Sequence, residues 1–182
     1  IQGCSFINNR LLTGDGGGAM HINQSAPLIQ NCIFNGNSAP HGGAILLERG
    51  EAVISNCTFE GNEATVYAGG AIAGGMNFDY GWGEATIIDC YINENTAPSG
   101  GGISIEVGTY KIIRTNITNN IANGVGFIDY GHGIPNGGGG IAVYATEGLY
   151  LEDVNIKDNQ VLNDAIFSGI YSHWGRNRIV FA

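Results

Sequence analysis

The sequence predicts an all-β fold: a right-handed parallel β-helix of about six turns, with three short strands per turn, formed by residues 1–182 as a single domain. The first observation is composition, because 31 of the 182 residues are Gly and only 13% are charged. Such a chain is short of helix formers and favours strands and tight turns. The second is an internal repeat that runs the whole length of the chain. The third is that the apolar residues of each repeat do not keep to alternate positions along the strand. They switch from one face to the other partway, which requires a fixed bend.

Two short phrases make up the repeat. The first, of the form I-x-N-C-x-F-x-x-N, occurs at 3–9, 29–37, 54–62, 87–95, 112–120 and 151–159. The second, of the form GGAI, follows each copy at 17–20, 42–45, 69–72, 100–103, 138–141 and 167–170. Within the first phrase the leading Ile or Leu and the Phe or Ile are always five residues apart, whereas the spacings outside it vary. We therefore expect one corner of each turn to be invariant and two corners to accept insertions.

Residue parity locates that invariant corner. Cys57 and Phe59 are two residues apart, so their side chains face the same side of a strand. Ile54 is an odd number of residues from both and would face the other side, yet its position is apolar in each copy of the repeat. All three can face inward only if the chain bends between them. Gly, Asn and Asp tolerate the left-handed conformation of a tight bend, and with one Arg they occupy this position throughout: Gly3, Asn31, Asn56, Asp89, Arg114 and Asp153.

The second phrase supplies the third predicted strand of each turn. Its alternating apolar residues form the expected inward pairs Met20/Ile22, Ile45/Leu47, Ile103/Ile105 and Ile141/Val143. Stacked turns would place equivalent residues about 4.8 Å apart. The sequence thus predicts an apolar ladder (Phe6, Phe34, Phe59, Ile92, Ile117, Ile156), an amide ladder bonded to backbone or to the next Asn (Asn9, Asn37, Asn62, Asn95, Asn120, Asn159) and a thiol ladder (Cys4, Cys32, Cys57, Cys90).

The four cysteines allow three interpretations. Buried free thiols that act as small hydrophobes are favoured. Disulfides between neighbouring turns are an alternative, although parallel Cβ vectors fit the disulfide torsion poorly. A metal site is the third alternative, and no C-x-x-C motif supports it.

The alternation of FxxN with GG[A/G]I, led by NCxF, resembles the repeats of the chlamydial polymorphic membrane proteins and related bacterial surface proteins with a pectin-lyase-like β-helix. The resemblance covers essentially the whole chain. It implies a passenger domain displayed outside the cell, with adhesion as the usual role. It implies no catalytic residues, because the matched positions are framework. The chain departs from the pattern in having no Cys after Cys90 and no visible autotransporter barrel.

Composition also excludes some classes of function. Seven Lys and Arg against 16 Asp and Glu give a net charge of −9, which argues against a nucleic-acid partner. No apolar run approaches the roughly 18 residues of a transmembrane helix. No signal peptide is visible, and the chain opens inside a strand, so we expect a mature or excised segment. We expect no cofactor.

Insertions at 73–85 and 121–137 carry the candidate contact residues. Each contains Asp-Tyr-Gly followed by an aromatic ring, a combination that suits sugar rings or a protein partner. The alternative is that the rings simply cover apolar surface of the rod. The candidates are Asp79, Tyr80, Trp82, Asp129, Tyr130 and His132.

Catalysis is disfavoured by the outward positions of the GGAI strands. A hydrolase needs carboxylates on neighbouring turns, and a lyase needs a Ca²⁺ cluster beside a base. These positions hold Ala, Gly, Leu, Ser, His and Tyr, and we expect no catalytic residue and a flat, exposed packing face. His21, His41, His132 and His173 lack metal-ligand spacing and are predicted to be surface or turn residues.

The sequence therefore predicts a non-enzymatic, extracellular or cell-surface β-helix segment, adhesin-like or structural, with the bacterial outer surface as its expected location. Its partner would be a surface glycan, a protein or another copy of the chain. One alternative is a subunit of an end-to-end filament, because neither end carries a polar cap. Another is a carbohydrate-binding or polysaccharide-cleaving β-helix.

Overall fold

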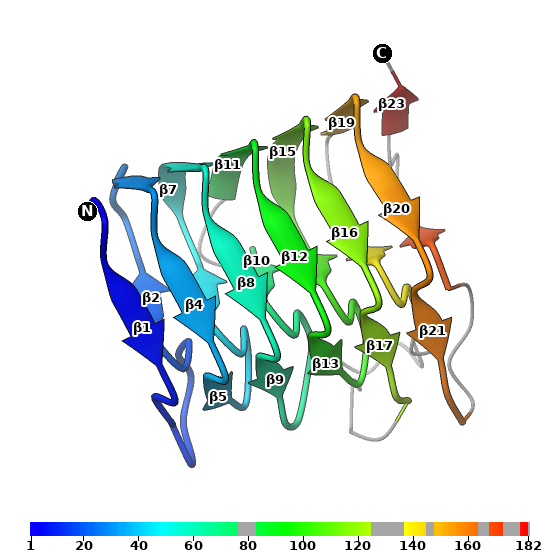
Figure 1. Cartoon of the computed structure of the whole chain (residues 1–182), viewed down its shortest axis with the longest axis horizontal. Helices are drawn as coiled ribbons and strands as arrows, with labels where there is room; N and C mark the ends of the chain where they lie inside the picture. The colour runs from blue at the N-terminus through cyan, green and yellow to red at the C-terminus, as the bar shows by residue number, and fades with distance from the viewer. Residues whose placement is uncertain (76–82, 125–136, 145–147, 164–167, 173–178, 182) are drawn as a thin grey trace.

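The chain winds into a coil in which each turn adds one strand to each of several parallel sheets (Figure 1). The structure is a computed structural model and describes residues 1–75, 83–124, 137–144, 148–163, 168–172 and 179–181. Three sheets have six strands and the fourth has five, and the strand pairings are parallel.

We number the sheets 1 to 4. Sheet 1 contains β1 (Ser5–Ile7), β4 (Ile33–Asn35), β8 (Thr58–Glu60), β12 (Tyr91–Asn93), β16 (Asn116–Thr118) and β20 (Asn155–Lys157). Sheet 2 contains β2 (Met20–Ile22), β6 (Ile45–Leu47), β10 (Ile72–Gly74), β14 (Ile103–Ile105), β18 (Ile141–Val143) and β22 (Ile170–Ser172). Sheet 3 contains β3 (Leu28–Gln30), β7 (Gly50–Ser55), β11 (Gly83–Ile88), β15 (Gly108–Ile113), β19 (Gly148–Glu152) and β23 (Ile179–Phe181). Sheet 4 contains β5 (Ser38–Ala39), β9 (Glu63–Ala64), β13 (Thr96–Ala97), β17 (Ile121–Ala122) and β21 (Gln160–Val161).

The predicted fold class, an all-β parallel β-helix, is confirmed. Five complete turns lead from β1 to β20, and further strands begin a sixth. The turns that begin at β4, β8, β12, β16 and β20 also have a strand that the sequence does not predict, the two-residue strand of sheet 4, whereas the first turn has only the isolated bridge of Arg10 to Ser38 at this place. Two residues are too few to show a periodicity of two, so this strand left no pattern to recognise.

The first predicted insertion begins and ends in regular strands, and the second begins in one. β10 extends to Gly74 and β11 starts at Gly83, so the described ends of 73–85 belong to sheets 2 and 3. In the same way, Ile121–Ala122 at the start of 121–137 form β17 of sheet 4.

Left-handed backbone conformations lie on both sides of every strand of sheet 1 from β4 to β20. The predicted bend has positive φ in all six copies, including Arg114 (φ 44), with the full set Gly3, Asn31, Asn56, Asp89, Arg114 and Asp153. A second left-handed residue precedes each ladder asparagine: Asn8, Gly36, Gly61, Glu94, Asn119 and Asp158. Because two corners with fixed conformation enclose three strand residues, the length of this segment cannot vary, which explains the invariant spacing of the first phrase.

The apolar ladder runs through the interior of the coil. Phe6, Phe34 and Phe59 stack with ring centroids 4.9 and 4.7 Å apart and interplanar angles of 6° and 3°. Ile92 and Ile117 continue the column and are completely buried, whereas Phe6 and Ile156 near the ends are partly buried. The ladder spacing equals the strand spacing, so in-register pairing alone brings the rings into contact.

The asparagine ladder joins successive turns by side-chain hydrogen bonds. Nδ2 of Asn62 donates to Oδ1 of Asn95 at 2.9 Å and to the Phe34 carbonyl at 3.0 Å. Its Oδ1 accepts from the backbone N of Asn37 at 3.0 Å and from Nδ2 of Asn37 at 2.9 Å. The same pattern links Asn9 through to Asn159. Each buried amide in the middle of the column is therefore fully hydrogen-bonded.

Replacing a ladder asparagine should destabilise the coil. Asn62→Ala removes the acceptor for the Asn37 N–H and leaves buried partners without hydrogen bonds, so we expect a loss of about 1–3 kcal/mol in the free energy of unfolding. Asn116→Ala on the exposed face of sheet 1 is the matched control, with an expected change within about 0.5 kcal/mol. Urea denaturation measures both. Equal effects of the two substitutions would contradict a stabilising role for the ladder.

Candidate functional site

The six contact residues predicted from the insertions, Asp79, Tyr80, Trp82, Asp129, Tyr130 and His132, lie outside the described residues. Their role therefore stays a prediction. The described surfaces offer other candidates, which follow from the way each sheet presents its outward side chains.

The prediction of a flat, exposed face on sheet 2 is wrong. Its outward side chains Leu46, Ala73, Ser104 and Ala142 are at most 1% exposed. Around Ala142 the packing is aromatic, since Tyr144 and Tyr171 contact it and meet edge to face at 6.3 Å. Small outward residues here are explained by close packing within the chain rather than by a free docking surface.

A row of residues just beyond the ends of β6, β10, β14 and β18 carries two carboxylates that the sequence analysis missed. Backbone hydrogen bonds continue the ladder into this row, from Gly75 N to the Leu47 carbonyl and from Glu106 N to the Gly74 carbonyl, both 2.8 Å. The row contains Glu48, Gly75, Glu106 and Tyr144. Glu48 and Glu106 each lie two residues after an outward residue of the strand, Leu46 and Ser104. The alternation of side chains along a strand could therefore have identified them from the sequence.

The surroundings of the two carboxylates differ. Glu48 lies 3.3 Å from Nε2 of His21, and both side chains are partly exposed. Glu106 is 5% exposed, and its charge acts on two neighbouring hydroxyls. Burial, reinforced by this carboxylate, raises the pKa of Tyr110 and of Tyr144. Two turns separate the glutamates, or about 10 Å along the axis, close to the carboxylate separation of inverting glycosidases.

Hydroxyl groups accompany Glu106 on this side of the coil. Ser99 Oγ and the Tyr144 hydroxyl are hydrogen-bonded at 2.5 Å, and Ser99 Oγ also donates to the Gly137 carbonyl at 2.8 Å. Ser104 Oγ is buried and has no hydrogen-bond partner in the described part of the chain. A carboxylate and several hydroxyls are thus held in a shielded environment, which is the donor and acceptor set that a sugar requires.

His41 lies in the bend between β5 and β6, in line with the predicted surface or turn position, but it is buried and not at the surface. It is 2% exposed and stacks on Tyr67 with ring centroids 3.8 Å apart. Its Nε2 lies 3.6 Å from Oδ1 of Asp15, and its Nδ1 has no hydrogen-bond partner among the described residues. Burial lowers the pKa of His41 to about 4, and the Asp15 carboxylate opposes this change only in part. The ring is therefore neutral at pH 7.

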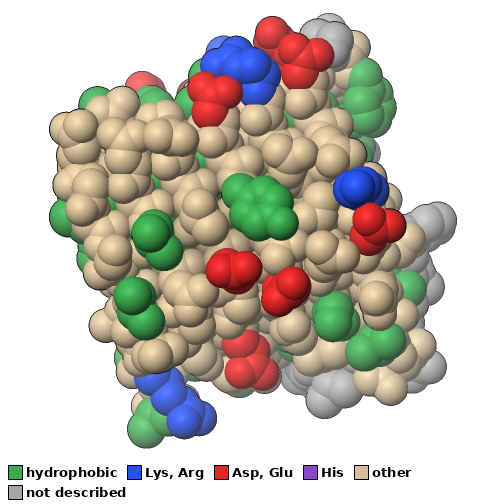
Figure 2. All heavy atoms as spheres, in the orientation of Figure 1, with side chains coloured by type: hydrophobic (Ala, Val, Ile, Leu, Met, Phe, Trp, Pro, Cys, Tyr) green, Lys and Arg blue, Asp and Glu red, His purple; other side chains and the backbone are tan. Residues whose placement is uncertain are grey.

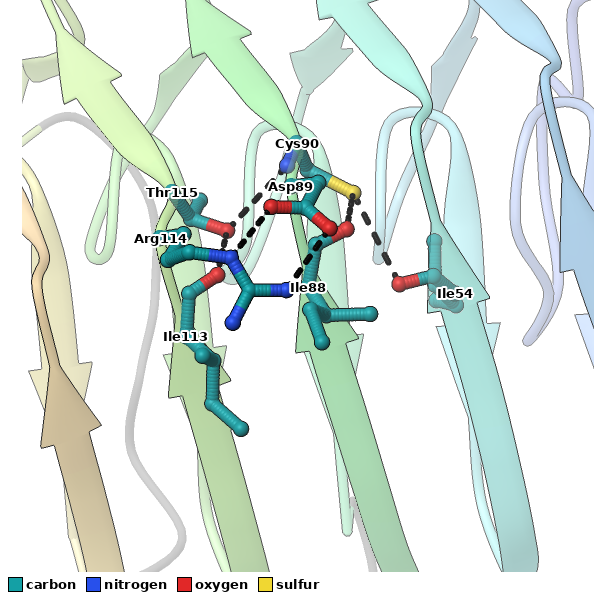
Figure 3. A network of polar contacts seen from close by, with 7 residues as sticks. All are labelled: Ile54, Ile88, Asp89, Cys90, Ile113, Arg114 and Thr115. Atoms are coloured by element: carbon teal, nitrogen blue, oxygen red, sulfur yellow. Dashed lines mark hydrogen bonds and ion pairs between the residues drawn. The ribbon is translucent and has the colours of Figure 1, made fainter.

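The cysteine column forms hydrogen bonds and no disulfides, since all four thiols are free. The Cys57 thiol donates to the Ser55 carbonyl at 3.2 Å, and its Sγ accepts the Cys32 N–H at 3.4 Å. Thr115 takes the same role two turns further on, where its Oγ1 accepts the Cys90 N–H at 3.2 Å (Figure 3). Cys32, Cys57 and Cys90 are buried and Cys4 is exposed. From Cys4 to Thr115 each member of the column can both donate and accept, whereas Val154, in register with Thr115, is apolar.

Arg114, the unusual corner residue, is explained by an ion pair with the corner of the preceding turn. Its Nε and Nη2 donate to the two carboxylate oxygens of Asp89 at 2.7 and 2.9 Å (Figure 3). The pair holds the pKa of Asp89 below and that of Arg114 above the ordinary values, in each case chiefly through the hydrogen bonds. Both side chains are exposed, so the pair orients the corner and contributes little stability.

The outer face of sheet 1 is the broad exposed surface of the coil. Figure 2 shows that charged side chains are few over this face and that isolated hydrophobic groups protrude from it. Ile7 is 55%, Ile33 46% and Tyr91 41% exposed. Polar neighbours bond along the axis, as from Asn155 Nδ2 to Asn116 Oδ1 at 3.1 Å. The face therefore combines one exposed aromatic ring with preformed amide donors and acceptors.

Within the described ranges of the chain, no group of three or more His, Cys, Asp or Glu side chains is placed to hold a metal ion. These ranges also contain no helix with the length and apolar character of a membrane span.

Comparison with known families agrees with this architecture. The family model described as "Right handed beta helix region" matches residues 1–181. Searches of curated proteins and of solved structures find no match to the chain.

A pair of nearly isosteric substitutions tests the hydrogen-bonding role of the cysteine column. Thr at position 57 can accept the Cys32 N–H as Thr115 accepts that of Cys90, whereas Val cannot. We expect Cys57→Val to be less stable than Cys57→Thr by about 1 kcal/mol in the free energy of unfolding. Chemical denaturation of both variants gives the difference. Equal stabilities would show that the column needs only apolar volume.

The buried neutral His41 predicts a loss of stability in acid. The unfolded chain binds a proton at this residue below pH 6.5, while the folded chain does so only near pH 4. Stability should therefore fall between pH 6.5 and 4, by about 3 kcal/mol in total from this residue. His41→Phe, which can keep the stack with Tyr67, should lose that part of the pH dependence. An unchanged slope in denaturation curves across this range would contradict the assignment.

Proposed function

The chain belongs to the right-handed β-helix family, and we propose that this member is a non-enzymatic extracellular scaffold of the adhesin-like type. The supporting observation is the uninterrupted set of ladders through its interior. Successive turns contact each other through stacked rings, through the hydrogen bonds of the asparagine ladder and through those of the cysteine column. A coil built in this way holds its outward side chains at fixed positions, which is what a rigid contact surface requires.

The face of sheet 1 is the proposed contact surface. Its strands from β4 to β20 are held between two left-handed corners, so Tyr91 and Ile33 project from a backbone with little freedom. An exposed ring on a rigid strand makes contact at a low cost in conformational entropy. Within the strands of sheet 1 the charged residues are Glu60 and Lys157, so this face suits a glycan or a protein surface better than a polyelectrolyte.

The same proposal covers the cellular location of the chain and the type of protein to which it belongs. The FxxN and GGAI repeats support a surface-displayed segment of the polymorphic outer membrane protein type, on the bacterial outer surface. Self-association end to end into a filament stays an alternative, and electron microscopy of the purified chain would distinguish filaments from short separate rods.

Adhesion of the purified chain tests the proposal. Beads coated with the chain should bind host cells or immobilised surface glycans, and Tyr91→Ala should weaken this binding about tenfold by removing the central ring. Val66→Ala is the control, because Val66 is also exposed but lies outside sheet 1. Absence of adhesion by the parent chain to all tested cells and glycans would refute the proposal.

A second candidate, action on polysaccharides, is favoured by the row that contains Glu48 and Glu106. An inverting hydrolase uses one carboxyl group as acid and another as base. Under this hypothesis Glu106→Gln and Glu48→Gln would each abolish release of reducing ends, while Glu60→Gln on sheet 1 would not. If the parent chain releases no sugar from neutral or acidic polysaccharides, this candidate is removed and the scaffold proposal stands.

A further inference from the structure

The outer face of sheet 3 contains a groove that none of the functions above uses. A hollow of about 160 Å³ lies over β7, β11 and β15. Glu51 and Glu84 face each other in register across β7 and β11, and Thr109 follows them on β15. The neighbouring row consists of Val53, Thr86 and Lys111. The floor is therefore a sheet whose outward side chains are mainly polar and fixed in position.

The two glutamates form an uncompensated pair of like charges. In-register residues of adjacent strands lie about 4.8 Å apart, and like charges placed opposite each other are unfavourable. Both side chains are exposed. Among the described residues, neither carboxylate takes part in an ion pair, and Lys111 makes none with them. A cationic group that bound between Glu51 and Glu84 would relieve this repulsion.

An aromatic ring lies at the other end of the same groove. Tyr150 is the in-register neighbour of Lys111 on β19. Its ring lies over Gly148, since a Cβ at that residue would come 2.9 Å from the ring. A second hollow of about 320 Å³ is lined by Ile113, Tyr150 and Val180 and shares Lys111 with the first. Glu84 and Glu51 thus lie two and three strand spacings from Tyr150, or about 10 and 14 Å along the axis.

We propose that this groove binds an amino-sugar oligosaccharide that lies along the coil axis. A protonated amino group pairs with Glu51 and Glu84, a sugar ring stacks on Tyr150, and hydroxyls between them bond to Thr86, Thr109 and Lys111. The reasons are chemical. Carboxylates attract an ammonium group and accept from hydroxyls, while an aromatic face packs against sugar C–H groups. The net charge of −9 favours a cationic chain over an acidic polysaccharide.

The inference rests on the proposed contact function and adds to it a ligand class and a second contact face. Titration calorimetry with a β-1,4-linked glucosamine hexamer at pH 6 tests it. We expect binding by the parent chain that weakens as salt is added. The N-acetylated hexamer should bind at least about tenfold more weakly, because it lacks the amino charge.

One double variant and one single variant locate the site. Glu51→Gln with Glu84→Gln, and separately Tyr150→Ala, should each reduce hexamer affinity at least about tenfold. The controls lie away from both faces: Glu63→Gln on sheet 4 and Val66→Ala, both at exposed positions, should leave it unchanged.

Three results would overturn the inference: no binding of the hexamer, equal losses in the control variants, or equally tight binding of the N-acetylated hexamer. Competition by a lysine-rich peptide that binds the groove more tightly than the hexamer would also overturn it, in favour of a protein ligand. The adhesion assay on the same variants separates the two proposals. A parent chain that adheres to cells and ignores the hexamer refutes the groove assignment alone.

Discussion

The asparagine ladder solves the problem on which the rest of this coil depends, the satisfaction of backbone hydrogen bonds at a corner. Strand ladders satisfy the backbone only while the strands are straight, and a left-handed residue interrupts them. At the corner after sheet 1, Asn62 supplies the missing partners, accepting from Asn37 N and donating to the Phe34 carbonyl. Its shape and its two functions, donor and acceptor, suit this position in a way that an apolar or ionised side chain cannot match.

The corner before sheet 1 has an analogous solution with different chemistry. There the Sγ of Cys57 and the Oγ1 of Thr115 accept the N–H groups of the preceding turn. A thiol and a hydroxyl are interchangeable in this role because each accepts one hydrogen bond and donates one. This accounts for a column in which Cys gives way to Thr along the chain while the backbone path remains the same. The thiols of Cys32, Cys57 and Cys90 are consequently part of the hydrogen-bond framework.

Repetition explains what could be predicted from the sequence. The bend at Arg114 was predictable despite its residue type, because five other copies place Gly, Asn or Asp there. Sheet 4 was not predictable, because a two-residue strand such as Ser38–Ala39 has no period. The burial of Leu46 and Ala142 was also missed, since it depends on tertiary cover and not on the local pattern. Glu48 and Glu106 fit the same alternation of side chains, but they lie just beyond the ends of the predicted strands in which that alternation was considered.

The division between inward and outward positions limits where function can reside. Inward positions repeat from turn to turn because each must fit the residue stacked above and below it. Outward positions have no such constraint: the row along sheet 1 contains Ser5, Ile33, Thr58, Tyr91, Asn116 and Asn155. Candidate binding residues on a solenoid are therefore the outward residues that differ from their equivalents in the other turns. By that criterion Tyr91 on sheet 1 and the groove of Glu51, Glu84 and Tyr150 on sheet 3 are candidates for binding. The ladders, in contrast, account for the stability of the scaffold.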